Sequence, residues 1–243
     1  MSARTWHDGT PTDLSGAAWN RLVPDFLGVG FRLRIAAGAE ALAHAEAGAR
    51  RVAQVVGARF DPVPWADLAA GSGPVEVVGG WERHLVHGLG APWTRATTVS
   101  LQPDRATAAR TLPWPWPESP TAGLPTISRL ADTQAERELD RSGHGLGLWL
   151  DGSGVVRAGT AGTPVVRLSD GTWVRAAGGP WPGWPVLALP AAVISPDVLA
   201  ATTALAAVSD LGEVVLARSL DGRTLAGSAL GPGSLRAALR RAD

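Results

Sequence analysis

The sequence predicts a two-domain α+β protein, and three observations lead to this fold class. An alanine-rich run, Glu40 to Val56, has the composition of a helix. Short runs on both sides of it alternate apolar and polar residues, as strands do. A stretch rich in proline and tryptophan separates the two sets of elements. We therefore expect an N-terminal α+β domain over 1–112, a linker over 113–125 and a strand-rich α/β domain over 126–243.

The composition excludes several classes of protein. A chain of 243 residues with 45% hydrophobic residues can bury a large core, and its formal net charge of zero argues against a nucleic-acid partner. Without cysteine, disulfides, thiolate nucleophiles and cysteine-bound zinc are excluded. No leader-like segment or long apolar run is present, so we expect a cytoplasmic protein without membrane contact.

In the first domain, Arg32 and Arg34 alternate with the apolar residues of 31–35, which predicts a strand with one charged face. The two arginines either face solvent or point into a cleft, where they would bind carboxylate or phosphate. The helix that follows should end at Gly57, a C-cap signal. Further strands are expected at 75–78, 81–86 and 97–101, with Gly79–Gly80 as a hairpin turn.

The run W-E-R-H-L-V-H carries two histidines, His84 and His87. Strand alternation places Arg83 on the face opposite His84, and it also separates the two histidines. A metal site would need a further ligand at suitable spacing, and the sequence has none. We therefore expect no metal.

The segment from Thr111 to Pro125 is rich in proline, so we expect an extended connection that is neither helix nor inner strand. Trp114 and Trp116 within it either anchor a domain interface or form the walls of a pocket.

The second domain should alternate helices and short strands. L-G-L-W-L-D, a D-G-S-G turn and G-V-V-R-A predict a strand, a hairpin turn and a second strand. Beyond these elements, we expect helices at 126–139, 194–207 and 234–241, and strands at 164–168, 172–176 and 213–216.

The succession G-L-P-T-I-S-R-L, a helix, and L-W-L-D-G-S-G-V-V-R-A-G-T-A-G-T-P-V-V resembles the class IV aminotransferase family, which includes branched-chain aminotransferases and aminodeoxychorismate lyases. In that family G-x-K-x-x-x-R-L precedes the helix, and the strand pair carries D-x-x-G-x-V-x-E-G-T-x-S-N. The resemblance implies the two-domain class IV aminotransferase-like fold, usually as a homodimer. It also implies a cleft in which the lysine holds pyridoxal phosphate (PLP) as a Schiff base.

This chain departs from the family pattern at the cofactor contacts. The 22 residues counted as lysine or arginine are all arginine, so no side-chain amine can form a Schiff base. The positions that match the family's lysine, phosphate-binding arginine, ring-nitrogen glutamate, serine, asparagine and phosphate-binding threonine are Pro125, Ala47, Ala158, Gly162, Thr163 and Ala217. Ser219 keeps a serine of the last motif. We therefore expect no cofactor.

Two interpretations of function stay open. In the first, a PLP-independent enzyme uses the interdomain cleft for a small carboxylate-bearing substrate, by lyase, isomerase, dehydratase or cyclase chemistry in natural-product biosynthesis. In the second, the chain is an inactive relative that serves as a binding module or a partner subunit. The candidates for catalysis are Arg32, Arg34, His84, Ser128, Thr163 and Arg218, and those for the substrate pocket are Arg83, Trp114, Trp116, Thr160, Trp184 and Ser219.

Overall fold

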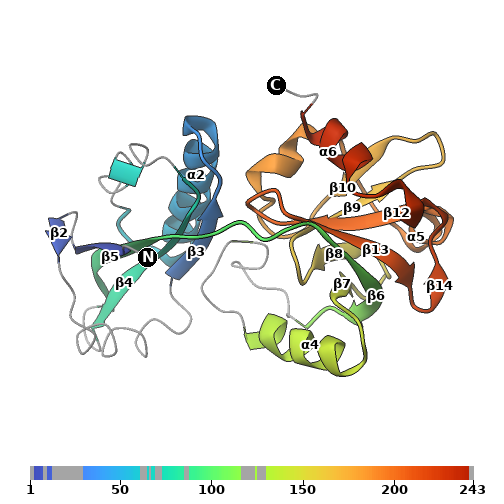
Figure 1. Ribbon diagram of the computed structural model, residues 1–243. Coiled ribbons are helices and arrows are strands. Elements are labelled where there is room, and N and C mark those ends of the chain that lie inside the picture. The colour runs from blue at the N-terminus through green and yellow to red at the C-terminus, as the bar shows by residue number, and fades with distance from the viewer. Residues whose placement is uncertain are drawn as a thin grey trace. The chain divides into compact units, whose positions relative to one another are not determined.

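The computed structural model describes residues 3–7, 10–12, 30–60, 65, 67–68, 73–84, 88–115, 124 and 130–240 (Figure 1). The chain divides into two compact units. The first comprises Met1–Leu101 and Ser119–Arg129, and the second comprises Gln102–Glu118 and Leu130–Asp243. Each unit is built on its own sheet.

The sheet of the first unit is antiparallel throughout and has the order β2-β1-β5-β4-β3. One face of it is covered by helix α2 (Ala39–Val56), which packs against β3 through small buried residues such as Ala45 and Ala49 (Figure 1). The helix ends at Gly57 in a left-handed conformation, so the predicted helix and its C-cap are confirmed. The strands are β1 (Ala3–His7), β2 (Thr10–Thr12), β3 (Gly30–Ile35), β4 (Val75–His84) and β5 (Gly88–Thr98).

The prediction of a hairpin turn at Gly79–Gly80 is wrong, because β4 runs through both glycines and ends at His84. Gly79 lies opposite Phe31 in the β3–β4 register, and a Cβ atom built on Gly79 would overlap the Phe31 ring. A Cβ atom built on Gly30, which lies opposite Gly80, would come within 2.6 Å of Gly79 O. These glycines permit close packing within the sheet, which is the other common reason for glycine in a strand.

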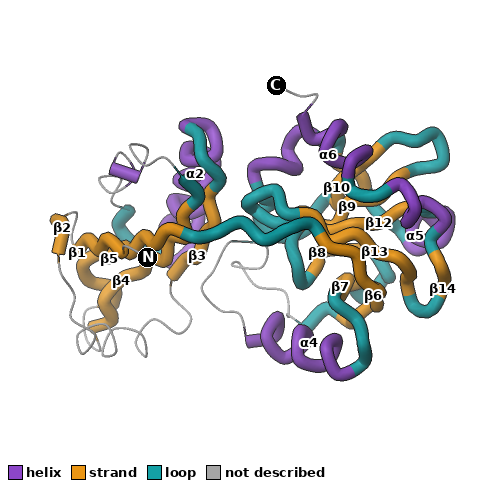
Figure 2. Tube along the Cα trace, viewed as in Figure 1, coloured by secondary structure: helices purple, strands orange, loops and turns teal. Residues whose placement is uncertain are grey.

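The larger sheet, in the second unit, has the order β11-β10-β9-β12-β13-β6-β7-β8, and β14 pairs with β13 (Figure 2). The predicted hairpin is confirmed: Trp149 lies opposite Ala158, and the D-G-S-G turn joins the two strands. The strands are β6 (Arg105–Pro113), β7 (Leu146–Leu150), β8 (Val156–Gly159), β9 (Thr163–Arg167), β10 (Trp173–Ala176), β11 (Ala191–Ala192), β12 (Ala204–Val208), β13 (Val214–Leu220) and β14 (Arg223–Thr224).

Two predictions for the second unit are wrong. Thr111 to Pro113 belong to β6, an inner strand that pairs in parallel with both β13 and β7. The helix expected over 194–207 covers only α5 (Pro196–Ala201), and the alanine-rich residues that follow form the inner strand β12. The helices of this unit are α4 (Leu130–Arg141), α5 and α6 (Gly233–Arg240), and the 3₁₀ turns are η1 (Trp184–Ala188) and η2 (Ala226–Leu230).

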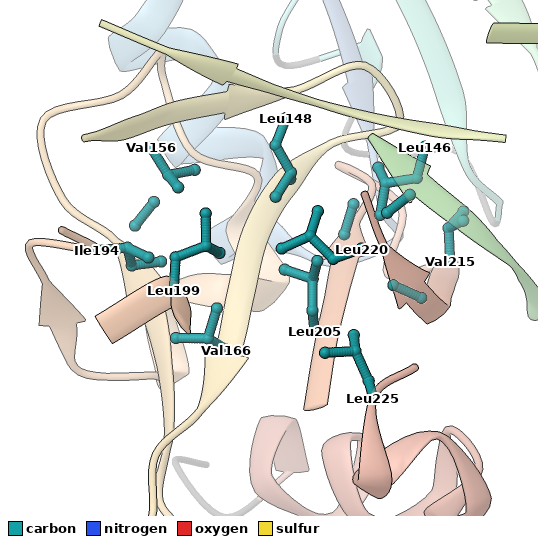
Figure 3. Close-up of a cluster of buried hydrophobic side chains, with 14 of the residues drawn as sticks. Leu146, Leu148, Val156, Val166, Ile194, Leu199, Leu205, Val215, Leu220 and Leu225 are labelled. Atoms are coloured by element: carbon teal, nitrogen blue, oxygen red, sulfur yellow. The ribbon is translucent and has the colours of Figure 1, made fainter. Parts of the chain in front are cut away.

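The second sheet buries apolar side chains on both faces. An inner cluster collects side chains such as Leu146, Leu148 and Leu205, which point toward one another (Figure 3). On the opposite face, an outer cluster that includes Trp173 lies with residues of η1 and α6. A third group, here called the α4 cluster, consists of Leu112, Ala135, Leu139, Trp149 and Ala158.

Candidate functional site

One face of the first sheet carries charged side chains, as the alternation in β3 predicted. Phe31, Leu33 and Ile35 are buried, whereas Arg32 and Arg34 are partly exposed. Their charges meet those of the neighbouring strand β4, where Glu76 is the register partner of Arg34. Arg32 donates from Nε and Nη2 to Glu76 Oε2, at 3.0 Å and 2.7 Å.

A third arginine extends this face onto β5. Val78 pairs with Arg32 on one side and with Arg95 on the other, so the two arginines lie on the same face of the sheet. We call Arg32, Arg34, Glu76 and Arg95 the arginine face; all are partly buried. The sequence did not point to Arg95, because the expected strand began at 97. It did not point to Glu76 either, because the sequence does not show which residues of β3 and β4 lie opposite each other.

Guanidinium groups side by side on a sheet can bind a planar carboxylate through paired N–H donors. Arg32 already binds one oxygen of the Glu76 carboxylate through two N–H groups. The arginine face therefore has the chemistry of a carboxylate-binding surface, with three cationic side chains and one anionic side chain among its described residues.

The structure does not test four other predicted residues. Arg83 and His84 close β4 after an irregularity in register at Trp81/Arg83, but their side chains are outside the described residues. Ser128 and Trp116 also lie outside the described residues, as does Pro125. These residues stay predictions.

Thr160 and Thr163 occupy the turn between β8 and β9. The Thr160 side chain is buried, and its Oγ1 accepts a hydrogen bond from Gly147 N at 3.0 Å. Thr160 N in turn donates to Gly147 O at 3.0 Å, so this residue ties the turn to β7. Thr163 opens β9 opposite Val208 and is partly buried. Thr160 thus has a structural task that the sequence did not reveal.

The remaining predicted residues are dispersed over the second unit. Trp114 packs against the α4 cluster, and its backbone N donates to Leu150 O at 2.8 Å. Trp184 opens η1 and is partly buried. Arg218 is exposed on β13, and Ser219 lies next to it opposite Thr224 of β14. The structure therefore does not gather Trp114, Trp184 and the β13 pair into one cluster of described contacts.

Three of the positions that the resemblance assigns to cofactor contacts have apolar surroundings or face outward. Ala158 is 6% exposed and belongs to the α4 cluster, with Trp149 directly opposite. Ala217 is fully buried in the inner cluster. Ala47 lies on the exposed side of α2. A methyl group at each of these positions offers neither charge nor hydrogen bond to a phosphate or a pyridine ring.

Carboxylates with shifted pKa values serve as structural acceptors. Hydrogen bonds from Ser153, from Val155 N and from Arg157 lower the pKa of Asp151 to about 2. Arg236 and Val214 N lower the pKa of Asp104 below its ordinary value. Among the described residues, no group of three or more histidine, aspartate or glutamate side chains is placed to hold a metal ion.

No protein-family model matches the chain, and no curated protein matches it. Solved structures are similar to it over nearly its full length. A fold IV-transaminase from Curtobacterium pusillum has a TM-score of 0.76 at 18% identity, and the match covers 99% of this chain and 100% of that one. A branched-chain aminotransferase from Thermoproteus uzoniensis has a TM-score of 0.71 at 19% identity, covering 98% and 93%.

A 4-amino-4-deoxychorismate lyase from Pseudomonas aeruginosa is also similar, with a TM-score of 0.64 at 22% identity over 96% of this chain and 98% of that one. The chain therefore has the α+β class IV aminotransferase-like fold, shared by branched-chain aminotransferases and aminodeoxychorismate lyases. Among the helices that the structure describes, none has the length and hydropathy of a membrane span.

Proposed function

We propose that this chain uses the class IV aminotransferase-like fold without PLP and binds a small carboxylate-bearing molecule on its arginine face. The observation that carries the proposal is the juxtaposition of Arg32, Arg34 and Arg95 with Glu76 on one face of the sheet. Lyase, isomerase, dehydratase or cyclase chemistry fits such a surface, because arginines can stabilise negative charge that develops next to a bound carboxylate. His84, in the last position of β4, is the candidate acid–base group.

Independence from PLP is supported by the residues that the chain lacks. There is no lysine, so no side chain can form the Schiff base that anchors the cofactor. A desolvated phosphate needs charged donors, and removing one member of such a buried pair costs on the order of 3–5 kcal/mol. With alanine at 47 and 158, neither the phosphate nor the pyridine nitrogen has its charged partner. These residues do not fit PLP.

The ligand class follows from charge and shape. Glu76 fixes Arg32 through two N–H groups that meet one carboxylate oxygen. The described residues of this face include three arginines and one glutamate, and a carboxylate ligand would add negative charge to it. Arginine is also the cation best matched to a planar carboxylate, which argues for a carboxylic acid over a neutral ligand.

The second candidate is an inactive relative that binds or stabilises a partner subunit. The α4 cluster favours it, because Ala158 is packed among apolar side chains where the family has a carboxylate. In either case we propose a cytoplasmic homodimer, and for the enzyme a place in natural-product biosynthesis.

Calorimetric titration of the full chain with succinate and other small dicarboxylates tests the carboxylate site. We expect Arg34→Gln and Arg95→Gln each to weaken binding about tenfold or more, the usual size for a lost charge-assisted hydrogen bond. Arg141→Gln, at the exposed end of α4, removes the same charge elsewhere and should leave the affinity unchanged. Equal affinities in all variants would reject the arginine face as the site.

A spectrum of the protein mixed with PLP tests cofactor independence separately. We expect the absorbance of free PLP, without the shift that accompanies a protein-bound species. Dicarboxylate binding without turnover of any tested substrate, together with co-purification of a catalytically active partner, would favour the second candidate.

A further inference from the structure

A second pair of arginines lies on the outer face of the larger sheet, within the second unit. On β10, Val174 and Ala176 belong to the inner cluster, whereas Trp173 belongs to the outer cluster. Arg175 is two residues beyond Trp173 and therefore shares its face. On the neighbouring strand β9, Arg167 is the register partner of Trp173. Arg167 and Arg175 are thus diagonal neighbours with Trp173 beside both.

Two N–H groups on this face are covered and have no acceptor among the described residues. Trp173 is 5% exposed, and its Nε1 makes no hydrogen bond to any residue that the structure describes. Arg175 Nε is likewise inaccessible to solvent and makes no hydrogen bond within the described part of the chain, although Arg175 as a whole is partly exposed. Buried polar groups are normally paired, so two adjacent exceptions call for an explanation.

Neither arginine is paired with a carboxylate among the described residues. The contact of Arg167 is a backbone one, from Nε to Gly171 O at 3.1 Å. Asp170, the acidic residue of the β9–β10 turn, accepts from Thr172 N at 2.8 Å. The outer face of β9 and β10 therefore carries two positive charges with no described carboxylate bonded to either of them.

The kind of ligand that could pair with these N–H groups follows from their chemistry. An indole nitrogen and a guanidinium nitrogen are donors only, so whatever pairs with them must be an acceptor. Water is an acceptor, but it leaves the two charges unbalanced. Residues on diagonal positions of adjacent strands lie about 7–8 Å apart, so the guanidinium groups of two such arginines can both reach one small anion. An oxyanion offers two or more acceptor oxygens in the fork geometry that arginine matches.

We infer that the outer face of β9 and β10 is a binding site for a small oxyanion, a carboxylate or a phosphate. Arg175 and Arg167 supply the charge, and Trp173 Nε1 donates a further hydrogen bond. The site involves residues of the second unit alone. It does not depend on the arginine face, so a negative result for this site would not contradict the proposed function.

The indole proton of Trp173 provides a direct readout in the full-length protein. We would record ¹H–¹⁵N spectra while titrating inorganic phosphate, and separately succinate, at constant ionic strength. Trp173→Phe assigns the resonance among the eleven tryptophans. We expect a saturable shift of this indole signal, and the anion that saturates it at the lower concentration identifies the ligand class.

Arg175→Gln should weaken this binding about tenfold or more, because a charge-assisted hydrogen bond is lost. Arg167→Gln is the second variant and should act in the same direction. Arg105→Gln, an exposed arginine at the start of β6, is the matched control and should bind as the unmodified chain does.

An indole signal that neither anion moves would overturn the inference in the unmodified protein, whether or not the arginine variants fold. That result would mean that water alone pairs with the buried N–H groups. An equal loss of affinity in Arg105→Gln would also overturn it, because the binding would then be general attraction to positive charge.

Discussion

The two sheets place their charged side chains differently. In the first, arginines from β3 and β5 lie across one face, with Glu76 between them. In the second, carboxylates gather at strand ends and accept backbone N–H groups. Glu213 accepts from Gln102 N, Asp104 from Val214 N, Asp221 from Thr111 N, and Asp151 from Ser153 N and Val155 N. Carboxylates used in this way hold strands together and are poor candidates for general bases.

On the second sheet, Ala158 lies in the apolar α4 cluster, at the position where the family pattern has a glutamate. We expect Ala158→Glu to lower the free energy of unfolding by about 3 kcal/mol or more, because a carboxyl group would be buried without a partner. The loss should grow as the pH rises, since burial favours the neutral form. Urea denaturation at several pH values measures both effects.

Val193→Glu is the matched control, because Val193 is 61% exposed and the same side chain there should be almost neutral for stability. A stable Ala158→Glu protein that bound PLP with a changed absorbance spectrum would break the comparison. It would mean that a cofactor-sized opening persists next to the α4 cluster.

The first sheet can be tested through its close-packed glycines. Gly79→Ala should destabilise the chain by about 2 kcal/mol, because the new methyl group would overlap the buried Phe31 ring and force it to move. Gly73→Ala is the control, since a Cβ there meets no atom of the described residues within 4 Å. Thermal unfolding of both variants gives the comparison. Equal stabilities would show that Phe31 is not held against β4.

The sequence predicted correctly those elements that local residue patterns specify. The helix α2 and the β7–β8 hairpin follow from alanine content, a glycine cap and a D-G-S-G turn, which are local signals. Strand β12 was predicted as helix because A-L-A-A-V is rich in a helix former. The strand is buried on both faces between neighbours, where small side chains fit, and tertiary packing overrides propensity.

Strand β6 was missed because its pairing is not local. Its pairing with β7 and β13 is parallel and joins residues far apart in the sequence, so no turn marks it. Pro113 ends the strand, and the prolines beyond it suggested a linker.

The arginine face was predictable in part. Alternation within β3 placed Arg32 and Arg34 together, and this prediction is confirmed. Arg95 could join them only through the register of β5 with β4, which no single strand encodes. Arg175 was not singled out for a different reason: its significance lies in a buried Nε without a described acceptor, and the sequence does not show burial of a single atom.

The strand-end carboxylates of the second sheet should contribute measurably but modestly. Asp104 accepts two short hydrogen bonds from Arg236 of α6, both at 2.6 Å. Because the Arg236 side chain is 42% exposed, we expect its interaction with Asp104 to be worth only about 1 kcal/mol. A double-mutant cycle with Asp104→Asn and Arg236→Gln, followed by urea denaturation, measures it. A coupling free energy of zero would mean that α6 is held by Leu235 and the outer cluster alone.

The smallest expected effect is the pH dependence contributed by Asp151. Its pKa is lowered to about 2 from an ordinary 3.8, so the folded state favours the ionised form. The stabilisation is therefore complete above pH 3.8 and is lost as the pH falls toward 2. In Asp151→Asn this part of the acid sensitivity should disappear, whereas Asp140→Asn, on the exposed side of α4, should retain it. Unfolding midpoints measured at neutral and acidic pH decide between them. Identical acid sensitivity in both variants would show that the charge of Asp151 does not stabilise the D-G-S-G turn. The strand-end carboxylates would then not stabilise the second sheet through their charge.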